Sequence, residues 1–312
     1  MSDAPVSDAD GTGGQPDSVG ASTRYTHGGD EWILVELSEA MSLQVNMRAQ
    51  AICRMLEARR VSGVLDVCCA NASYLIRVDP DTIDPRAAVE ILREIEQEVG
   101  DAREFQLQTR VVQVPILWED EWTHETLMRF RDRHQTPDRT DIEFAAELNG
   151  FASKEEFKQA VCATPFLASM TGFVPSLAWW YQLTTPDKLL EVPKYVRPRT
   201  DTPERAFSWG GAFAAIYPVR GAGGYQLLGM CATPQVDPTR RLPDFHDADW
   251  FFRVGDLAVF TPVDRREYDR IRAEVEAERF RYRQVPVQFV PADFEADPDA
   301  VNAALMRSLD GG

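Results

Sequence analysis

The pattern of apolar residues changes at about residue 114, and this change constrains the fold more than any other feature of the chain. Before it, residues 42–60 and 85–99 repeat apolar side chains with the spacing of amphipathic helices. Strand-like segments alternate with these helices, at residues 31–37, 61–67, 72–78 and 105–114. The order strand, helix, strand, strand, helix, strand predicts a ferredoxin-like α+β domain over residues 28–112.

The following region, residues 113–290, has a different pattern of apolar residues. It begins with helical patterns at residues 122–134 and 141–161. From residue 170 onward, short apolar runs such as FVPSLAWWYQL and WFFRVGDLAVFTPV are interrupted by proline and glycine. Many short strands with such breakers are typical of a closed β-barrel or a β-sandwich. The chain is therefore predicted to be an α+β protein in which a β-rich domain follows the first domain.

The two ends are expected to lie outside these domains. Residues 1–27 are rich in Ser, Asp, Gly and Ala and have almost no large apolar side chain, which predicts a disordered acidic tail. Residues 291–312 carry five acidic side chains against one arginine and are interpreted as an acidic C-terminal tail. Apolar residues at helical spacing predict a short helix within that tail, over residues 299–309.

Charge and cysteine content exclude several function classes. The 33 Lys and Arg residues against 50 Asp and Glu residues give a net charge of −17, the opposite of the cationic field that a nucleic-acid-binding protein needs. Apolar runs are too short to span a membrane, and the N-terminus does not read as a signal peptide. Five cysteines without a CxxC pair indicate a reduced, cytoplasmic protein rather than a disulfide or zinc scaffold.

The common catalytic motifs are missing from the sequence. It contains neither the phosphate loop nor GxGxxG, and neither HExxH nor GxSxG. The segment PDFHDADW at residues 243–250 holds oxygen and imidazole ligands, but a polar loop is the preferred interpretation, and no metal site is predicted.

Three local features could bind a ligand. Arg197, Arg199 and Arg205 cluster in a proline-rich loop, where they could grip a carboxylate or phosphate or form surface ion pairs. The run Gly221-Ala222-Gly223-Gly224 exposes backbone amides that could approach an oxyanion, although such a glycine-rich run is more often a hairpin turn. The aromatic run at residues 179–181 cannot face one side of a strand, so one ring faces a pocket or partner unless all three pack in the core.

Several motifs in a fixed order resemble one known family. They are GGDEWILVEL at the start of the body, GFVP at residues 172–175, RPRTDTPERAFSWGGAFAAIYP at 197–218, GAGGYQLLG at 221–229 and VGDLAVFTPV at 254–263. Over residues 28–290 the chain is similar to the first subunit of the allophanate hydrolase and carboxyltransferase-domain family, which includes a 5-oxoprolinase subunit and the sporulation-kinase inhibitor KipI.

This resemblance implies a fold and a partner. The fold would be a small α+β domain, ferredoxin-like by the pattern above, followed by a cyclophilin-like β-barrel. A homologous second subunit would complete the active site in a heterodimer or heterotetramer. Members of the family transfer a carboxyl group from carboxybiotin to urea or open a lactam with ATP, so the resemblance implies a hydrolase or carboxyltransferase subunit. The resemblance allows ATP or carboxybiotin as a cofactor, and no motif in the sequence binds either one.

The matching positions also imply site residues. Arg199 and Tyr217 are the predicted catalytic residues. The predicted substrate-binding residues are Phe173, Phe213, Ala214, Gly223, Gly224 and Tyr225. The family pattern Q-T-G-I-Y-P reads FAAIYP at residues 213–218, G-F-x-P-G ends in Ser176, and a histidine is replaced by Val161. Losing an amide, a hydroxyl and an imidazole predicts a pocket that is more apolar than is usual in the family.

Three functions remain open from the sequence. The first is a catalytic subunit whose active site is shared with its partner. The second is a regulatory binding protein that acts through its surface, in the manner of the kinase inhibitor. The third is a barrel pocket that catalyses another reaction, such as cyclisation of a bulkier apolar substrate.

Overall fold

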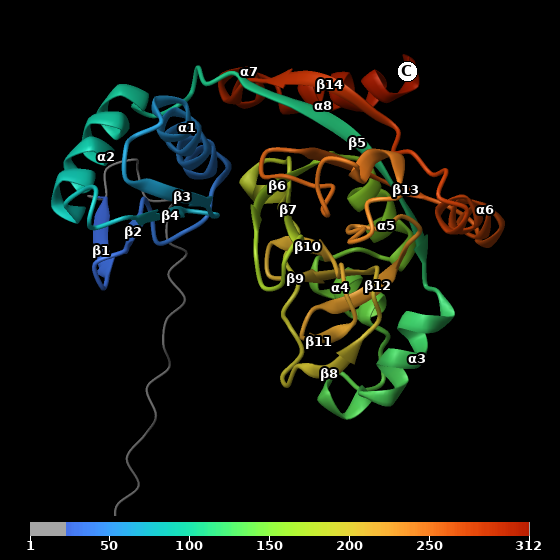
Figure 1. Ribbon diagram of the computed structural model, residues 1–312. Coiled ribbons are helices and arrows are strands. Elements are labelled where there is room, and N and C mark those ends of the chain that lie inside the picture. The colour runs from blue at the N-terminus through green and yellow to red at the C-terminus, as the bar shows by residue number, and fades with distance from the viewer. Residues whose placement is uncertain (1–22, 312) are drawn as a thin grey trace, which may run out of the picture.

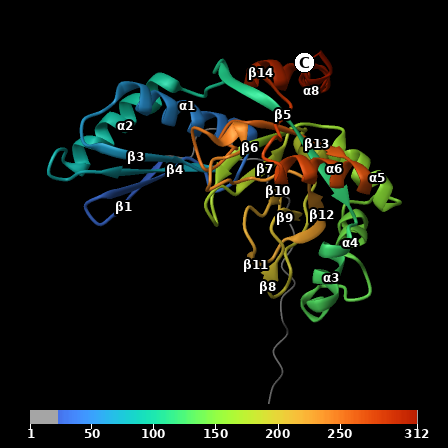
Figure 2. The same cartoon turned by 45° about the vertical axis from the view of Figure 1, so that its right-hand side comes forward.

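The computed structural model describes residues 23–311, which form an N-terminal sheet with two helices and a β-barrel with further helices around it (Figure 1). The N-terminal sheet has four antiparallel strands in the order β1-β2-β4-β3. Its strands are β1 (Arg24–Gly28), β2 (Trp32–Glu36), β3 (Val64–Cys69) and β4 (Ser73–Val78). Its helices are α1 (Leu43–Arg59) and α2 (Pro85–Val99), and both cover the same face of the sheet (Figure 2).

Alternation along the strands explains this face. Ile33 and Val35 of β2 and Ile76 of β4 are fully buried against both helices, whereas the residues between them are more exposed. The helices begin at side-chain caps, because Ser42 accepts a hydrogen bond from the Val45 amide and Asp84 accepts one from the Arg86 amide. The second helix also has proline at its first position, where no intrahelical amide bond is lost.

The fourth strand of the expected ferredoxin-like pattern lies elsewhere. Residues 105–114 belong mainly to β5 (Leu107–Trp118), which pairs in the barrel. The place beside β2 is occupied instead by β1, which forms a hairpin with β2 through Gly29 in a left-handed conformation (φ 71°). The ferredoxin-like arrangement is therefore not confirmed. Residues 24–27, which were expected in the disordered tail, are part of this hairpin, and the rest of that expected tail, up to residue 22, lies outside the described residues.

The barrel is closed by seven strands. Their order is β12-β9-β10-β7-β6-β13-β5, and an antiparallel pairing of β12 with β5 closes the ring. Besides β5, its strands are β6 (Phe166–Thr171), β7 (Ala178–Gln182), β9 (Ala206–Gly210), β10 (Phe213–Ile216), β12 (Gln226–Cys231) and β13 (Leu257–Pro262). β14 (Gln284–Phe289) extends the sheet beyond β5, and β8 (Arg199–Thr202) pairs with β11 (Gly221–Gly223) in a separate two-stranded sheet.

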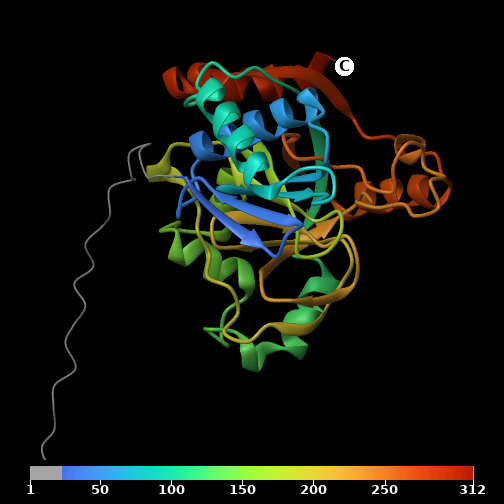
Figure 3. The same ribbon diagram turned by 60° about the vertical axis from the view of Figure 1, so that its left-hand side comes forward.

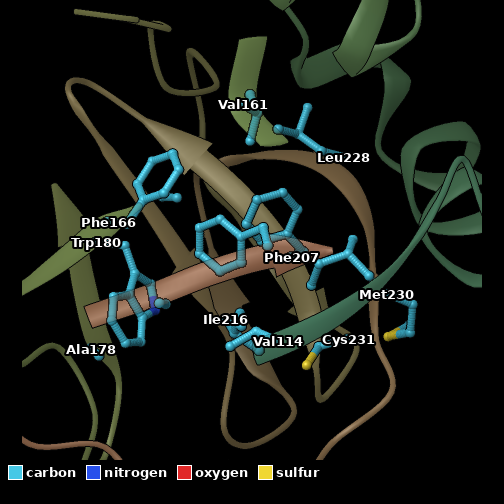
Figure 4. Close-up of a cluster of buried hydrophobic side chains, with 14 of the residues drawn as sticks. Val114, Val161, Phe166, Ala178, Trp180, Phe207, Ile216, Leu228, Met230 and Cys231 are labelled. Carbon is cyan, nitrogen blue, oxygen red and sulfur yellow. The ribbon is translucent and has the colours of Figure 1, made fainter. Parts of the chain in front are cut away.

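Aromatic side chains fill the interior of the barrel. The rings of Phe166, Trp180, Phe207 and Phe260 are at most 1% exposed, and neighbouring rings pack at 4.7–6.1 Å between centroids. Figure 4 shows Phe166, Trp180 and Phe207 within this cluster of buried side chains. Such close packing means that large-to-small changes leave cavities. Any substrate-sized site has to be sought on the outer surface of this barrel.

Helices surround the barrel. They are α3 (Glu121–Arg129), α4 (Asp141–Leu148), α5 (Lys154–Cys162), α6 (Arg265–Glu276), α7 (Pro291–Ala296) and α8 (Pro298–Ser308), with 3₁₀ turns at Arg131–Arg133, Pro186–Lys188, Pro243–Phe245 and Leu309–Gly311. The pattern at residues 141–161 forms two helices, because Gly150 adopts a left-handed φ of 74° between them. The expected C-terminal tail is largely ordered: α8 matches the expected helix, and Phe294 and Leu305 are buried against β5 and β14.

A polar seam joins the N-terminal part to the barrel, and Figure 3 shows the N-terminal sheet and helices in front of it. Asn46 of α1 is fully buried and donates to the carbonyls of Ala70 and Asn71 at 3.1 Å and of Ser169 in β6 at 3.0 Å. The Ser169 hydroxyl in turn donates to the Asn71 side chain at 2.7 Å.

No helix among residues 23–311 is long and apolar enough to cross a membrane.

Candidate functional site

The predicted site residues meet on the outside of the barrel. Side chains alternate along β10, so Ala214 points into the packed interior whereas Phe213 and Ala215 point outward. Outside, rings of neighbouring strands form what we call the aromatic face. It consists of Phe173, Trp179, Phe213, Tyr217 and Tyr225. The ring centroid of Trp179 lies 5.3 Å from that of Phe213 and 6.0 Å from that of Tyr225.

Two glycines allow the tyrosines of the aromatic face to pack closely. A Cβ atom on Gly210 would lie 2.3 Å from the Tyr225 ring, and one on Gly223 would lie 2.1 Å from the Tyr217 hydroxyl. Gly223 pairs with Arg199 between β11 and β8, and the Gly224 carbonyl accepts a hydrogen bond from the Tyr195 amide at 2.7 Å. The glycine run is thus held beside Arg199 and both tyrosines.

Arg199 lies beneath the aromatic face and is completely buried. Its guanidinium carbon is 4.5 Å from the Tyr195 ring centroid, and its Nε donates to the Thr202 hydroxyl at 3.3 Å. Neither Nη1 nor Nη2 has a hydrogen-bond partner, and within residues 23–311 no carboxylate oxygen lies within 4 Å of this guanidinium. A buried cation with two vacant donor groups is an unusual and costly feature.

Asp141 supplies a negative charge near Arg199 without pairing with it directly. Its carboxylate accepts hydrogen bonds from the Tyr195 hydroxyl at 2.7 Å and from the Leu227 amide, and the His134 Nε2 atom lies 3.5 Å away. Burial raises the pKa of Asp141, although these donors and the positive charge of Arg199 oppose that rise. The His134 Nδ1 atom accepts from the Thr136 amide at 2.9 Å, so its lone pair is already used, and Nε2 has no hydrogen-bond partner within the described residues.

Five of the thirteen buried side-chain polar atoms that lack a hydrogen-bond partner in the described part of the chain lie at or beneath the aromatic face. They are Trp179 Nε1, Arg199 Nη1 and Nη2, Tyr225 Oη and Gln226 Oε1. Leaving each such group unsatisfied costs about 1–3 kcal/mol, so their retention calls for an explanation. All but the Gln226 oxygen can donate, which suits a ligand rich in acceptor oxygens. The ammonium group of Lys194, 5.2 Å from the Tyr225 ring centroid, adds positive charge at the same place.

The loop between β6 and β7 holds a strained backbone above this cluster. Phe173 has a φ of 75° and Ser176 a φ of 71°, a region that side chains other than glycine seldom adopt. The Phe173 side chain is 66% exposed, and its ring centroid lies 6.5 Å from that of Tyr217. Ser176 occupies the position at which the family pattern G-F-x-P-G has glycine. Backbone strain of this kind is often found at active sites and ligand-binding sites.

Seven of the eight predicted residues therefore lie in one region, and Ala214 is the exception. The expectation that Phe213 and Ala214 line one pocket is wrong, because the two-residue period of a strand places them on opposite faces. Of the other clustered arginines, Arg197 pairs with Asp132 at 3.1 Å and Arg205 donates to Tyr268 at 3.1 Å.

Three further residues of the site, Asp141, Tyr195 and Lys194, are not predicted from the sequence. No motif marks them, since helix α4 and the loop before β8 bring them there only in the folded chain. Trp179 was singled out only as part of an aromatic run, and strand alternation assigns it to the outer face. In the segment at residues 243–250, Asp244 accepts from the Tyr282 amide and Asp249 pairs with Arg240, and no group of three metal-ligating side chains occurs within the described part of the chain.

Comparisons with known proteins agree with this architecture. A family model described as "Carboxyltransferase domain, subdomain C and D" matches residues 23–245. The urea amidolyase of Lachancea kluyveri is 26% identical over 275 residues, which are 87% of this chain and 15% of that protein. A 5-oxoprolinase subunit of Bacillus subtilis is 22% identical and is matched over 79% of this chain and 95% of its own length.

A solved structure shares the fold. The urea carboxylase of Kluyveromyces lactis superposes with a TM-score of 0.78 at 21% identity, over 95% of this chain and 26% of that one. The chain thus spans only a small part of the amidolyase and carboxylase relatives but nearly all of the oxoprolinase subunit. On the extent of the family match, the chain belongs to the carboxyltransferase-domain family, in the part described as subdomains C and D.

Proposed function

We propose that this chain is one part of a carboxyltransferase- or amidohydrolase-type enzyme, with its active site at the aromatic face and shared with a homologous second carboxyltransferase-type subunit. The observation that carries the proposal is the set of buried donors without partners at Trp179, Arg199 and Tyr225. Similarity to a urea amidolyase and to a 5-oxoprolinase subunit supports the reaction class.

The donors suit acyl-transfer chemistry. Attack on a carbonyl or ureido carbon moves negative charge onto oxygen, and donors fixed in a water-poor site stabilise that charge. Arg199 would orient a carboxylate or ureido oxygen, and the Gly223 and Gly224 amides would assist. Burial raises the pKa of Tyr217, and the nearby Arg199 offsets this only in part, so its hydroxyl stays protonated and can donate.

The aromatic rings would bind the flat part of such a substrate. Trp179 and Phe213 pack edge to face and form one side of the aromatic face, which suits stacking of a planar amide or ureido group. Phe213 and the neighbouring Ala215 make this side more apolar than the family pattern. That difference supports a substrate bulkier and less polar than urea or 5-oxoproline.

The residues fit a carboxylate better than a triphosphate. Arg199 and Lys194 are two positively charged groups, and the Arg199 Nη atoms have no hydrogen-bond partner. Two positive charges are enough to bind one carboxylate but too few to balance the charge of ATP. When bound, carboxybiotin would supply an activated carboxyl group, and Arg199 with Tyr225 would hold its carboxylate oxygens. An ATP-dependent reaction would need phosphate-binding groups from the second subunit.

Exposure of the aromatic face supports the second subunit. The Phe173 ring is two-thirds exposed, Trp179 is only half-buried, and no side chain of this face is positioned as a general base. A homologous subunit seated there would cover the rings and supply the base. The same exposed Phe173 also favours the alternative of a regulatory protein that binds a partner without catalysis.

The test is reconstitution with a homologous second subunit. Together the two chains should act on an N-alkylated urea with carboxybiotin or on an alkylated 5-oxoproline with ATP, and more weakly on the unsubstituted compounds, whereas the isolated chain should be inactive. Phe173→Ser should weaken subunit association, and Leu148→Ser, which changes a leucine of similar exposure on α4, should not. Full activity of the isolated chain would refute a shared site. Partner binding without activity on either substrate pair would favour the regulatory alternative.

A further inference from the structure

A cleft between the N-terminal part and the barrel shares no lining residue with the aromatic face. One cavity of about 460 Å³ is lined by α1, β3 and the loop before β13, and an adjoining cavity of about 770 Å³ continues along β5 and β14. The two share Arg54, Arg253 and Val254 as lining residues and so adjoin each other. Cavities of this size at a junction between structural units are a common setting for small-molecule sites.

Two arginines line both cavities of this cleft. Arg54 comes from α1, and Arg253 comes from the loop before β13 on the barrel. Arg54 Nη1 donates to the Gln108 carbonyl at 3.3 Å, but within the described residues no carboxylate oxygen lies within 4 Å of either guanidinium. Asp256, an acidic residue that lines the same cleft, is already bound by Arg110 at 2.7 and 3.1 Å and by the Arg253 backbone amide at 3.0 Å. Both guanidinium groups can therefore take an anionic ligand.

A buried acceptor without a partner lies beside Arg54. Gln50 is 2% exposed, and its amide nitrogen donates to Asn46 at 2.8 Å, but its Oε1 atom has no donor. The position of a Cβ atom on Gly255 would be 2.8 Å from Gln50 Oε1 and 3.0 Å from Arg54 Nη2. The cleft thus presents an acceptor and a cationic donor side by side, with a second cation across from them.

We propose that this cleft binds an amino dicarboxylic acid. One carboxylate would pair with Arg54, the adjacent α-amino group would donate to Gln50 Oε1, and the second carboxylate would pair with Arg253. Glu57 and Asp66, which line the outer part of the cleft, disfavour ligands that carry only negative charge. The ligand would bridge α1 and the barrel, and nothing in this proposal depends on the aromatic face.

Calorimetric titration of the full chain with L-aspartate, succinate and inorganic phosphate tests the proposal. Succinate is the matched ligand without the amino group, and phosphate reports binding of a bare anion. Aspartate should bind at least about tenfold more tightly than succinate or phosphate, because only aspartate has an ammonium group that can donate to Gln50 Oε1. One hydrogen bond of a charged group accounts for an affinity difference of about this size. Equal affinity for aspartate and succinate, binding of phosphate alone, or no binding of any of the three at millimolar concentration would overturn the proposal.

Variants of the chain complete the test. Arg54→Met and Arg253→Met should each weaken aspartate binding about tenfold or more, and Gln50→Leu should remove the preference for aspartate over succinate. Arg86→Met, which changes an exposed arginine on α2, is the control and should bind aspartate like the wild type. Should Gln50→Leu fail to fold, because Gln50 also contacts Asn46, the exposed Arg253 keeps the test decisive. Unchanged aspartate binding in Arg253→Met would contradict the site.

Discussion

The two sides of strand β10 are built on opposite principles. On the inner side, Ala214 and Ile216 pack into a closed aromatic core in which Trp180 and Phe207 are almost fully buried. On the outer side, Phe213 belongs to a half-covered surface around which buried donors lack partners. The inner side is optimised for stability, whereas the outer side retains groups that cost stability. This difference places binding capacity on the outer wall of the barrel.

The largest expected effect is on the inner side. Trp180→Ala should lower the free energy of unfolding by about 3–5 kcal/mol, because it removes a ring that packs at 4.8 Å from Phe252 and at 6.1 Å from Phe260. Denaturant unfolding monitored by circular dichroism measures this loss. A cost below about 1 kcal/mol would mean that the interior can collapse or is loosely packed, and the contrast between the two sides would fail.

A smaller effect is expected at the strained loop next to the aromatic face. Ser176→Gly should raise the free energy of unfolding by up to about 1 kcal/mol, since glycine adopts the φ of 71° without steric cost and loses only some of this gain to chain entropy. Thermal unfolding measures the change. Ser308→Gly in the C-terminal helix α8 is the control, and it should lower the free energy of unfolding because glycine is unfavourable within a helix. Ser153 is not used as the control because it caps α5. A lower melting temperature for Ser176→Gly would show that this loop is not strained.

The charge beneath the aromatic face predicts a pH dependence. Because burial raises the pKa of Asp141, the folded state binds this proton more tightly than the unfolded state, whose pKa is about 4. The contribution of Asp141 to the free energy of unfolding therefore falls as the pH rises from about 4 through the folded pKa. The Asp141→Asn variant has no carboxyl group that titrates at this position, so its free energy of unfolding does not decrease for this reason. Its stability relative to the wild type should therefore improve as the pH rises. Unfolding titrations at several pH values measure the trend, and a difference that does not change with pH would contradict it.

Much of the architecture follows from local patterns. The apolar spacing of residues 42–60 and 85–99 predicts α1 and α2 closely, and the interrupted apolar runs predict the barrel. The partner of a strand is decided by contacts distant in sequence, so residues 105–114 were assigned to the wrong sheet. The polar strand β1 carries too little apolar signal to be found in this way.

The candidate site could be predicted only in part, because local motifs identify some of its residues whereas contacts distant in sequence bring in the others. Motif positions identified Arg199, Tyr217 and Tyr225, and simple strand alternation would have separated Phe213 from Ala214. Asp141 and Tyr195 form a hydrogen-bonded pair across 54 residues, and no local pattern announces such a contact. Vacant hydrogen-bonding groups are likewise a property of the folded chain and cannot be read from residue types.

The stability of Arg199→Met tests the central claim most directly. If the buried guanidinium is retained for a ligand, an apolar side chain of similar length should leave the free energy of unfolding within about 1 kcal/mol of the wild type or raise it. The reconstituted complex should at the same time lose its activity. A loss of about 3–5 kcal/mol on denaturant unfolding would instead show that Arg199 is the structural counter-ion of Asp141, and the aromatic face would lose its principal binding group.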